Sequence, residues 1–95
     1  MFIVLLRFSA HRDQAARLMA GHNDWLRRGF DDGVFMLAGS LQPSAGGAIL
    51  AHGVSHDELH RRVAEDPFVA AGVVEPDILA VTPGKADPRL QFLLH

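Results

Sequence analysis

The order of strand-like and helical apolar patterns along this chain restricts its fold more than any other feature. Residues 2–8 are apolar almost throughout, which is typical of a strand buried on both faces. From Asp13 to Phe30 the apolar residues recur instead at helical spacing, and Ser9 or Asp13 is available to cap the start of this helix. Asp31-Asp32-Gly33 then has turn chemistry, so the helix is expected to end there.

Two further strands follow, joined by a short turn. Residues 34–41 and 47–54 are apolar segments, and the turn between them contains Pro43 and Gly46. Two strand-like segments separated by so few residues predict a β-hairpin.

The last third of the chain predicts a second helix and a fourth strand. Ser55 followed three residues later by Glu58 is a capping-box pattern, which marks a helix start. The helix is expected to end at Asp66-Pro67, because the residue before a proline avoids helical geometry. Residues 73–82 contain a fourth strand, and after a polar break the chain ends in an apolar tail at 90–94.

The predicted order is therefore strand, helix, strand, strand, helix, strand. With right-handed crossovers this order gives a four-stranded antiparallel sheet with both helices on one face, the ferredoxin-like α+β arrangement. We expect a single domain over residues 1–95, with a core of about 2–82 and a C-terminal tail over 83–95.

The first two strands are apolar on both faces, although two helices can cover only one face of the sheet. The expected faces are Phe2, Val4, Leu6 and Phe8 against Ile3 and Leu5, and Phe35 and Leu37 against Val34, Met36 and Ala38. A bare sheet face of this kind is an unusually large apolar patch for a monomer. We therefore predict a homodimer in which a second copy covers it, a dimeric α+β barrel.

Charge and composition exclude several classes of partner. The formal net charge is -2, so nothing favours a nucleic-acid backbone or an anionic membrane. Cysteine is absent, which excludes disulfides, thiol nucleophiles and cysteine metal sites. Arg7 interrupts the first apolar run long before it reaches membrane-spanning length, so we expect a cytoplasmic protein.

His22 and Asp66 are the candidates for chemistry, and each also has a structural interpretation. His22 shares the apolar stripe of the first helix with Leu18 and Leu26, so it points toward the sheet or its edge. A histidine there is either a general acid or base or a core residue with a satisfied ring N–H. Asp66 precedes a proline, which is a favoured way to start a helix, and capping alone explains an aspartate there.

Arg7 and Ser40 are candidates for substrate contact. In a sheet buried on both faces Arg7 needs a carboxylate or an anionic substrate, unless it reaches solvent at the strand end. Ser40 offers a hydroxyl at the end of the second strand. His52, His56 and His60 resemble a metal cluster, but no cysteine or acidic group completes a ligand set, so no metal and no cofactor are predicted.

From about Phe2 to Val81 the chain resembles the YciI-like (YCII-related) proteins, small ferredoxin-like proteins that form dimeric barrels. The features that carry the resemblance are the apolar first strand, the late helix-one histidine, Leu37-Ala38-Gly39, Gly47, Asp66-Pro67-Phe68 and Gly72. The chain departs from the family pattern at Ser40, where many members have proline.

The resemblance implies that His22 lies near Asp66 in a cleft. One relative removes chloride from a chlorinated hydroxyhydroquinone, so the family implies lyase-like or hydrolytic chemistry on a small molecule. The leading hypothesis is thus an enzyme in which Asp66 orients His22 for acid–base chemistry. The alternative is a dimeric module that binds a metabolite or protein, with the pair in a structural role. A cofactor-free monooxygenase shares the fold but is favoured by no residue.

Overall fold

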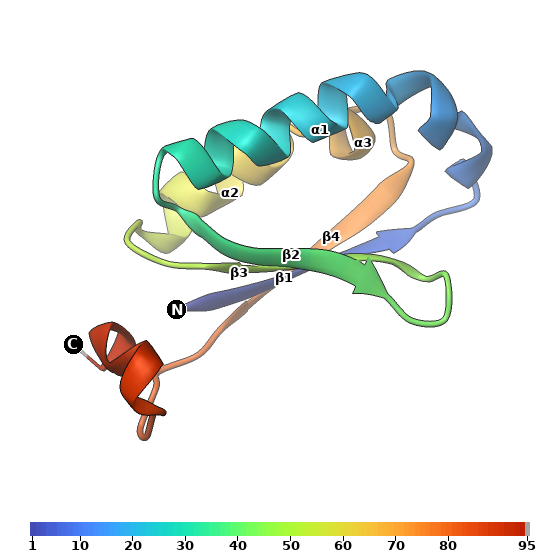
Figure 1. Ribbon diagram of the computed structural model, residues 1–95. Coiled ribbons are helices and arrows are strands. Elements are labelled where there is room, and N and C mark those ends of the chain that lie inside the picture. The colour runs from blue at the N-terminus through green and yellow to red at the C-terminus, as the bar shows by residue number, and fades with distance from the viewer. Residues whose placement is uncertain (95) are drawn as a thin grey trace.

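The computed structural model describes residues 1–94 and contains one four-stranded antiparallel sheet in the order β2-β3-β1-β4. The strands are β1 (Phe2–Phe8), β2 (Phe35–Leu41), β3 (Gly46–Ala51) and β4 (Val74–Ala80). The helices are α1 (Ala15–Asp31), α2 (His56–Ala64) and the short α3 (Pro67–Ala70), with 3-10 turns η1 (Arg12–Gln14) and η2 (Pro88–Leu93). The three α-helices lie on one face of the sheet (Figure 1), which confirms the ferredoxin-like prediction.

The predicted end of α1 is confirmed, and its predicted cap is wrong. Gly33 has a positive φ of 73° and donates to the Phe30 carbonyl, while Val34 donates to Gly29, the two bonds of a Schellman motif. Neither Ser9 nor Asp13 caps the start. Gln14 occupies the N-cap without a side-chain hydrogen bond. The 3-10 turn η1 leads directly into α1, so Gln14 already has helical backbone angles.

The core lies between the sheet and the helices. Its largest fully buried side chain is Trp25 of α1, and it also contains Val4, Leu6, Ile49, Leu59 and Val63. Gly29 permits the close approach of α1 to β2, because a Cβ there would lie only 2.0 Å from the Phe35 ring. The N-terminal part of β2 is therefore held directly beneath the C-terminal part of α1.

A β-bulge in β2 corrects the predicted faces of that strand. Phe35 pairs with Ala51 and faces the helices, whereas Leu37 pairs with Leu50 and faces the other side. The register shifts between Phe35 and Leu37, so the extra residue reverses the alternation that the sequence implied. Ala38 consequently faces the helices, opposite Ile49.

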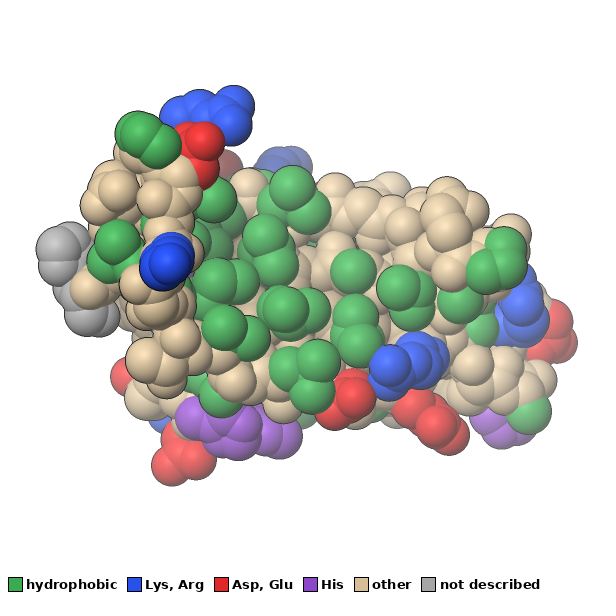
Figure 2. Space-filling view, turned by 90° about the horizontal axis from the view of Figure 1, so that it is seen from below, with side chains coloured by type: hydrophobic (Ala, Val, Ile, Leu, Met, Phe, Trp, Pro, Cys, Tyr) green, Lys and Arg blue, Asp and Glu red, His purple; other side chains and the backbone are tan. Residues whose placement is uncertain are grey.

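The sheet face away from the helices is largely apolar. Figure 2 shows hydrophobic side chains spread over it, with Arg and Asp or Glu side chains at one edge. By the pairing register, this open face carries Ile3, Leu5, Leu37, Leu50, Leu79 and Val81. None of the described helices packs over the centre of the open face (Figures 1 and 2), so the chain alone leaves this surface uncovered.

The tail folds into η2 and projects below the sheet (Figure 1). Asp87 caps η2 by accepting from the backbone N–H of Arg89, and the same two residues form an ion pair. These hydrogen bonds hold the pKa of Asp87 below its ordinary value. Phe92 contacts the His52 ring at 5.4 Å between centroids but stays half exposed, as does Leu90.

Candidate active site

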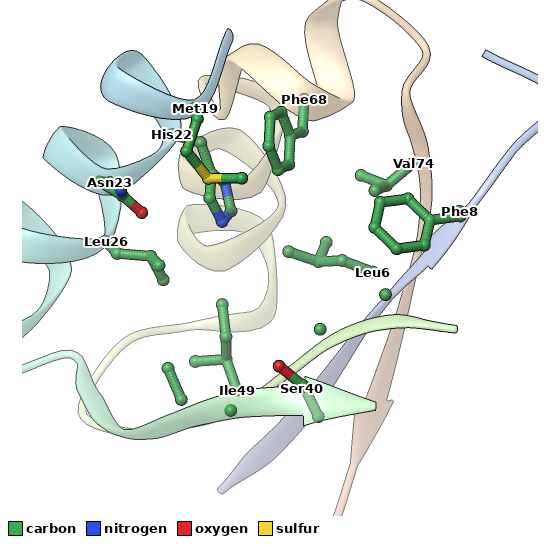
Figure 3. A pocket seen from close by; sticks show the side chains of 15 residues that line it. Leu6, Phe8, Met19, His22, Asn23, Leu26, Ser40, Ile49, Phe68 and Val74 are labelled. Atoms are coloured by element: carbon green, nitrogen blue, oxygen red, sulfur yellow. The ribbon is translucent and has the colours of Figure 1, made fainter. Parts of the chain in front are cut away.

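A cavity of about 310 Å³ lies between α1 and the sheet. Its walls are mostly apolar, and Leu6, Phe8 and Ile49 form part of the sheet side. Figure 3 shows the few polar groups that face this space: His22 and Asn23 come from α1, and Ser40 rises from β2. A pocket of mainly apolar lining with a few convergent polar groups is typical of a site for a small molecule.

The structure brings His22 and Asp66 into direct contact. His22 Nδ1 lies 2.8 Å from Asp66 Oδ1. The His22 side chain is 13% exposed and that of Asp66 is fully buried. The two residues are 44 positions apart in sequence, so the contact depends on the packing of α3 against α1.

Asp66 is held in place by its second role. It is the N-cap of α3, where Oδ1 accepts from the Phe68 backbone N–H at 3.0 Å and Pro67 occupies the first helical turn. The capping that the sequence predicted for Asp66 is therefore confirmed. Gly21 allows the two helices to meet closely, because a Cβ there would lie 3.1 Å from Pro67 Cγ.

Two aromatic rings fix the orientation of the imidazole. The Phe68 ring stacks on His22 with centroids 4.0 Å apart and an interplanar angle of 7°. Trp25 lies 5.8 Å away at 29°, and its indole N–H donates to the Arg62 carbonyl at 2.8 Å. The imidazole plane is thus set by packing as well as by the hydrogen bond.

The arrangement defines which nitrogen of His22 is available for chemistry. Asp66 Oδ1 accepts from the Phe68 N–H, and as a carboxylate it also accepts from His22 Nδ1–H. In neutral His22 the lone pair is then on Nε2. Nε2 has no hydrogen-bond partner within residues 1–94, and the ring points into the cavity (Figure 3). This geometry leaves Nε2 free to accept a proton from a bound molecule.

One atom of the pair lacks a partner. Asp66 Oδ2 is buried and makes no hydrogen bond to any described residue. A buried oxygen without a hydrogen bond lowers the stability of the fold, because it has lost its contacts with water. The pair therefore retains one acceptor atom that the described residues leave unused.

Ser40 and Arg7 lie on opposite sides of the sheet. Ser40 pairs with Gly47, and both line the cavity. Arg7 lies on the open face, where it forms an ion pair with Asp77 at 3.2 Å, and their side chains are 53% and 48% exposed. Arg7 therefore lies outside the set of residues that the cavity brings together.

Sequence reasoning missed Asn23, Met19 and Phe68 as neighbours of the site. Asn23 and Met19 adjoin His22 on α1, and both line the cavity. For Met19 the available signal was its position three residues before His22, because residues three apart are neighbours on a helix surface. Phe68 entered the sequence analysis only as part of the Asp66-Pro67-Phe68 motif, and its parallel contact with His22 depends on the docking of α3.

The remaining histidines do not assemble a metal site in the part of the chain that is described. His56 and His60 have ring centroids 4.5 Å apart on α2. No group of three or more His, Cys, Asp or Glu side chains suited to a metal ion occurs among residues 1–94. Within the same residues, no helix has the length and apolar character needed to cross a bilayer.

Comparison with known proteins gives three findings. No curated protein sequence matches the chain. Among solved structures, the chain is similar to the 5-chloro-2-hydroxyhydroquinone dehydrochlorinase TftG from Burkholderia phenoliruptrix AC1100, in complex with 2,5-dihydroxybenzoquinone. The TM-score is 0.71 at 19% identity, with 88% of this chain and 96% of that chain covered. The model of the YCII-related domain matches residues 1–81, and the chain therefore belongs to the YCII-related domain family.

Proposed function

We propose that this protein is a small-molecule enzyme of the lyase type in which His22 is the general acid or base and Asp66 orients it. The observation that carries the proposal is the 2.8 Å contact from Asp66 Oδ1 to Nδ1 of His22, whose imidazole ring points into the cavity (Figure 3). A carboxylate that fixes the tautomer and stabilises the imidazolium is the arrangement that makes a histidine an effective base.

The cavity suits a small ring-shaped substrate. Its volume of about 310 Å³ is at the low end for ligand pockets, and its walls are mainly apolar. The structural relative TftG holds 2,5-dihydroxybenzoquinone, a flat six-membered ring with oxygen substituents. We therefore propose a flat ring bearing hydroxyl or carbonyl oxygens, with Ser40 donating a hydrogen bond to one of them.

A lyase step can be written with this chain's groups alone. Nε2 of His22 takes a proton from a substrate carbon that lies beside a carbonyl group. The electron pair left behind forms a double bond and expels a leaving group, such as chloride, from the neighbouring carbon. Asp66 stabilises the imidazolium meanwhile, and the proton then passes from Nε2 to water.

The alternative is a binding module in which the pair is structural. The observation that favours it is the complete burial of Asp66 together with its cap to Phe68. Removal of one partner of a buried pair typically costs about 3–5 kcal/mol. Because Asp66 is also a cap, replacing it with a residue that cannot cap is costly in either case, and His22 is the better residue for separating the two functions.

The proposal includes a cytoplasmic homodimer. The open face carries apolar side chains on all four strands, including Leu37 and Leu79, both largely exposed in the single chain. A two-fold pair of such faces would bury them without any further element. The cavity lies on the helix side, so it stays accessible when the open faces meet.

The experiment that tests the function measures turnover of 5-chloro-2-hydroxyhydroquinone by chloride release, in wild type and in His22→Gln. We expect His22→Gln to reduce the rate at least about 100-fold, as removal of a general base does, while the circular dichroism spectrum is unchanged. His60→Gln, on the exposed surface of α2, is the matched control and should keep full activity. Equal rates in wild type and His22→Gln would contradict the proposal.

A further inference from the structure

Arg12, to which the sequence analysis assigned no role, packs against Phe8, one of the residues that line the cavity. Arg12 belongs to η1, and its guanidinium carbon lies 4.4 Å from the centroid of the Phe8 ring. Its Nη2 donates to the Ser44 carbonyl at 3.2 Å. Phe8 lines the cavity, and Ser44 is two residues before Gly46, which lines it too. The guanidinium therefore lies beside two segments that contribute lining residues, the end of β1 and the start of β3, although Arg12 is not itself a lining residue.

The charge of Arg12 is not neutralised by any described residue. Four other arginines each pair with an aspartate: Arg7, Arg27, Arg62 and Arg89. Arg12 has no carboxylate at ion-pair distance within residues 1–94, and its contacts are the partly buried Phe8 ring and the neutral carbonyl of the exposed Ser44. A guanidinium with such weak partners is available to bind an anion at little cost.

The cavity itself contains no lysine or arginine side chain in its lining. Its polar groups are His22, Asn23 and Ser40, and the buried Asp66 carboxylate lies behind His22. An anionic group on a ligand would therefore be unfavourable at the His22 end whenever that histidine is neutral. The positive charge of Arg12 makes the Phe8 end the favourable position for it.

We propose that Arg12 determines substrate specificity by recognising an anionic oxygen group, a carboxylate or an ionised hydroxyl, on a flat ring bound in this cavity. The ring would lie between the apolar walls, with its anionic group toward Phe8 and its reacting atoms toward His22. This proposal rests on the proposed function of the same cavity and adds the charge of the substrate and its direction of binding.

The competing explanation is that Arg12 only ties η1 to the β2–β3 turn. Loss of such a tie would loosen one wall of the cavity, and the affinities for charged and neutral ligands would fall to the same extent. A pair of ligands that differ in charge but not in shape separates the two explanations, and benzoate and benzamide form such a pair.

The experiment is a chemical-shift titration of 15N-labelled protein with benzoate and with benzamide, followed at the cavity glycines Gly46 and Gly47. Wild type is expected to bind benzoate more tightly than benzamide. Arg12→Gln should lower the affinity for benzoate about fivefold and leave the affinity for benzamide unchanged. A fivefold effect is about the size expected for one exposed charge contact. Added salt should lower the affinity for benzoate and leave that for benzamide unchanged, because salt screens charge contacts. Arg17→Gln, which removes an exposed arginine whose side chain donates to Gln14, is the matched control.

Three results would overturn the proposal: equal weakening of both ligands in Arg12→Gln, no weakening of benzoate, or no preference for benzoate in wild type, including no binding of either ligand. The test is independent of catalysis, because neither ligand has to transfer a proton. His22→Gln should keep the preference for benzoate over benzamide. If His22→Gln retained turnover while Arg12→Gln lost that preference, the proposed function would fail and the role of Arg12 would stand.

Discussion

The imidazole of His22 lies parallel to the ring of Phe68, with centroids 4.0 Å apart and planes 7° from each other. Phe68 is two residues from Asp66, and its backbone N–H donates to the same oxygen that contacts His22. A single turn of chain therefore supplies the carboxylate, the stacking surface and the cap that together hold the histidine. The predictions below separate these three contributions.

Asp66→Asn should separate the cap from the orientation of His22. Asparagine caps a helix about as well as aspartate, so α3 should keep its start. The amide has no charge to stabilise an imidazolium, and turnover should fall about 10²- to 10⁴-fold. Steady-state kinetics and amide hydrogen exchange at Phe68 measure the two effects. Full activity in Asp66→Asn would show that the carboxylate is only a cap.

Phe68→Leu should loosen the imidazole without touching its hydrogen bond. The Phe68 side chain is buried, so a smaller apolar residue should lower the free energy of unfolding by about 1–3 kcal/mol, measured in urea. Turnover should fall more than tenfold at a temperature where the variant is fully folded. Val69→Ala, the neighbouring change in α3, is the control. Parallel losses in both variants would argue that stability alone sets the rate.

Gly21→Ala should lengthen the contact between His22 and Asp66. The new Cβ would lie 3.1 Å from Pro67 Cγ, so α3 must shift by a few tenths of an ångström. We expect a lower kcat with little change in the circular dichroism spectrum. Gly84→Ala, where an added Cβ meets nothing within 4 Å, is the matched control. Unchanged kcat in Gly21→Ala would mean that the pair tolerates this displacement.

Leu79→Glu should prevent dimer formation, since it places a charge in the open face. Leu79 and Phe30 are each 43% exposed, but Phe30 lies at the end of α1 on the helix side, so Phe30→Glu is the control. Sedimentation velocity at micromolar concentration should show a dimer for wild type and Phe30→Glu and a monomer for Leu79→Glu. A monomeric wild type would contradict the proposed assembly.

Periodicity was sufficient to predict the fold, although the predicted cap of α1 was wrong. The apolar run at residues 2–8, the helical stripe of α1 and the Ser55 cap each involve neighbours in sequence, and the Ser55 hydroxyl does accept from the Glu58 N–H. The strand order then followed from handedness. What failed was the alternation in β2, because the bulge after Phe35 inserts one residue that no local pattern revealed.

The site was predictable only in part. The resemblance implied the pairing of His22 with Asp66, and the sequence alone indicated the helix face of His22 and the capping role of Asp66. Side chains alternate between the two faces along β1, and this alternation places Arg7 beside Asp77 on the open face. Arg12 is joined to the β2–β3 turn by its hydrogen bond to the Ser44 carbonyl, a contact across 32 positions that no spacing in the sequence indicates.

The most direct test of the account is the tautomer of His22, read from a long-range 1H–15N NMR spectrum of wild type and of Asp66→Asn. The account predicts a proton on Nδ1 and a free Nε2 in neutral His22 of the wild type, with the Nε2 resonance moving when 2,5-dihydroxybenzoquinone is added. Asp66→Asn should lose the preference for this tautomer. A proton on Nε2 in wild type, or an Nε2 resonance indifferent to the ligand, would contradict the claim that Asp66 presents a basic nitrogen to the cavity.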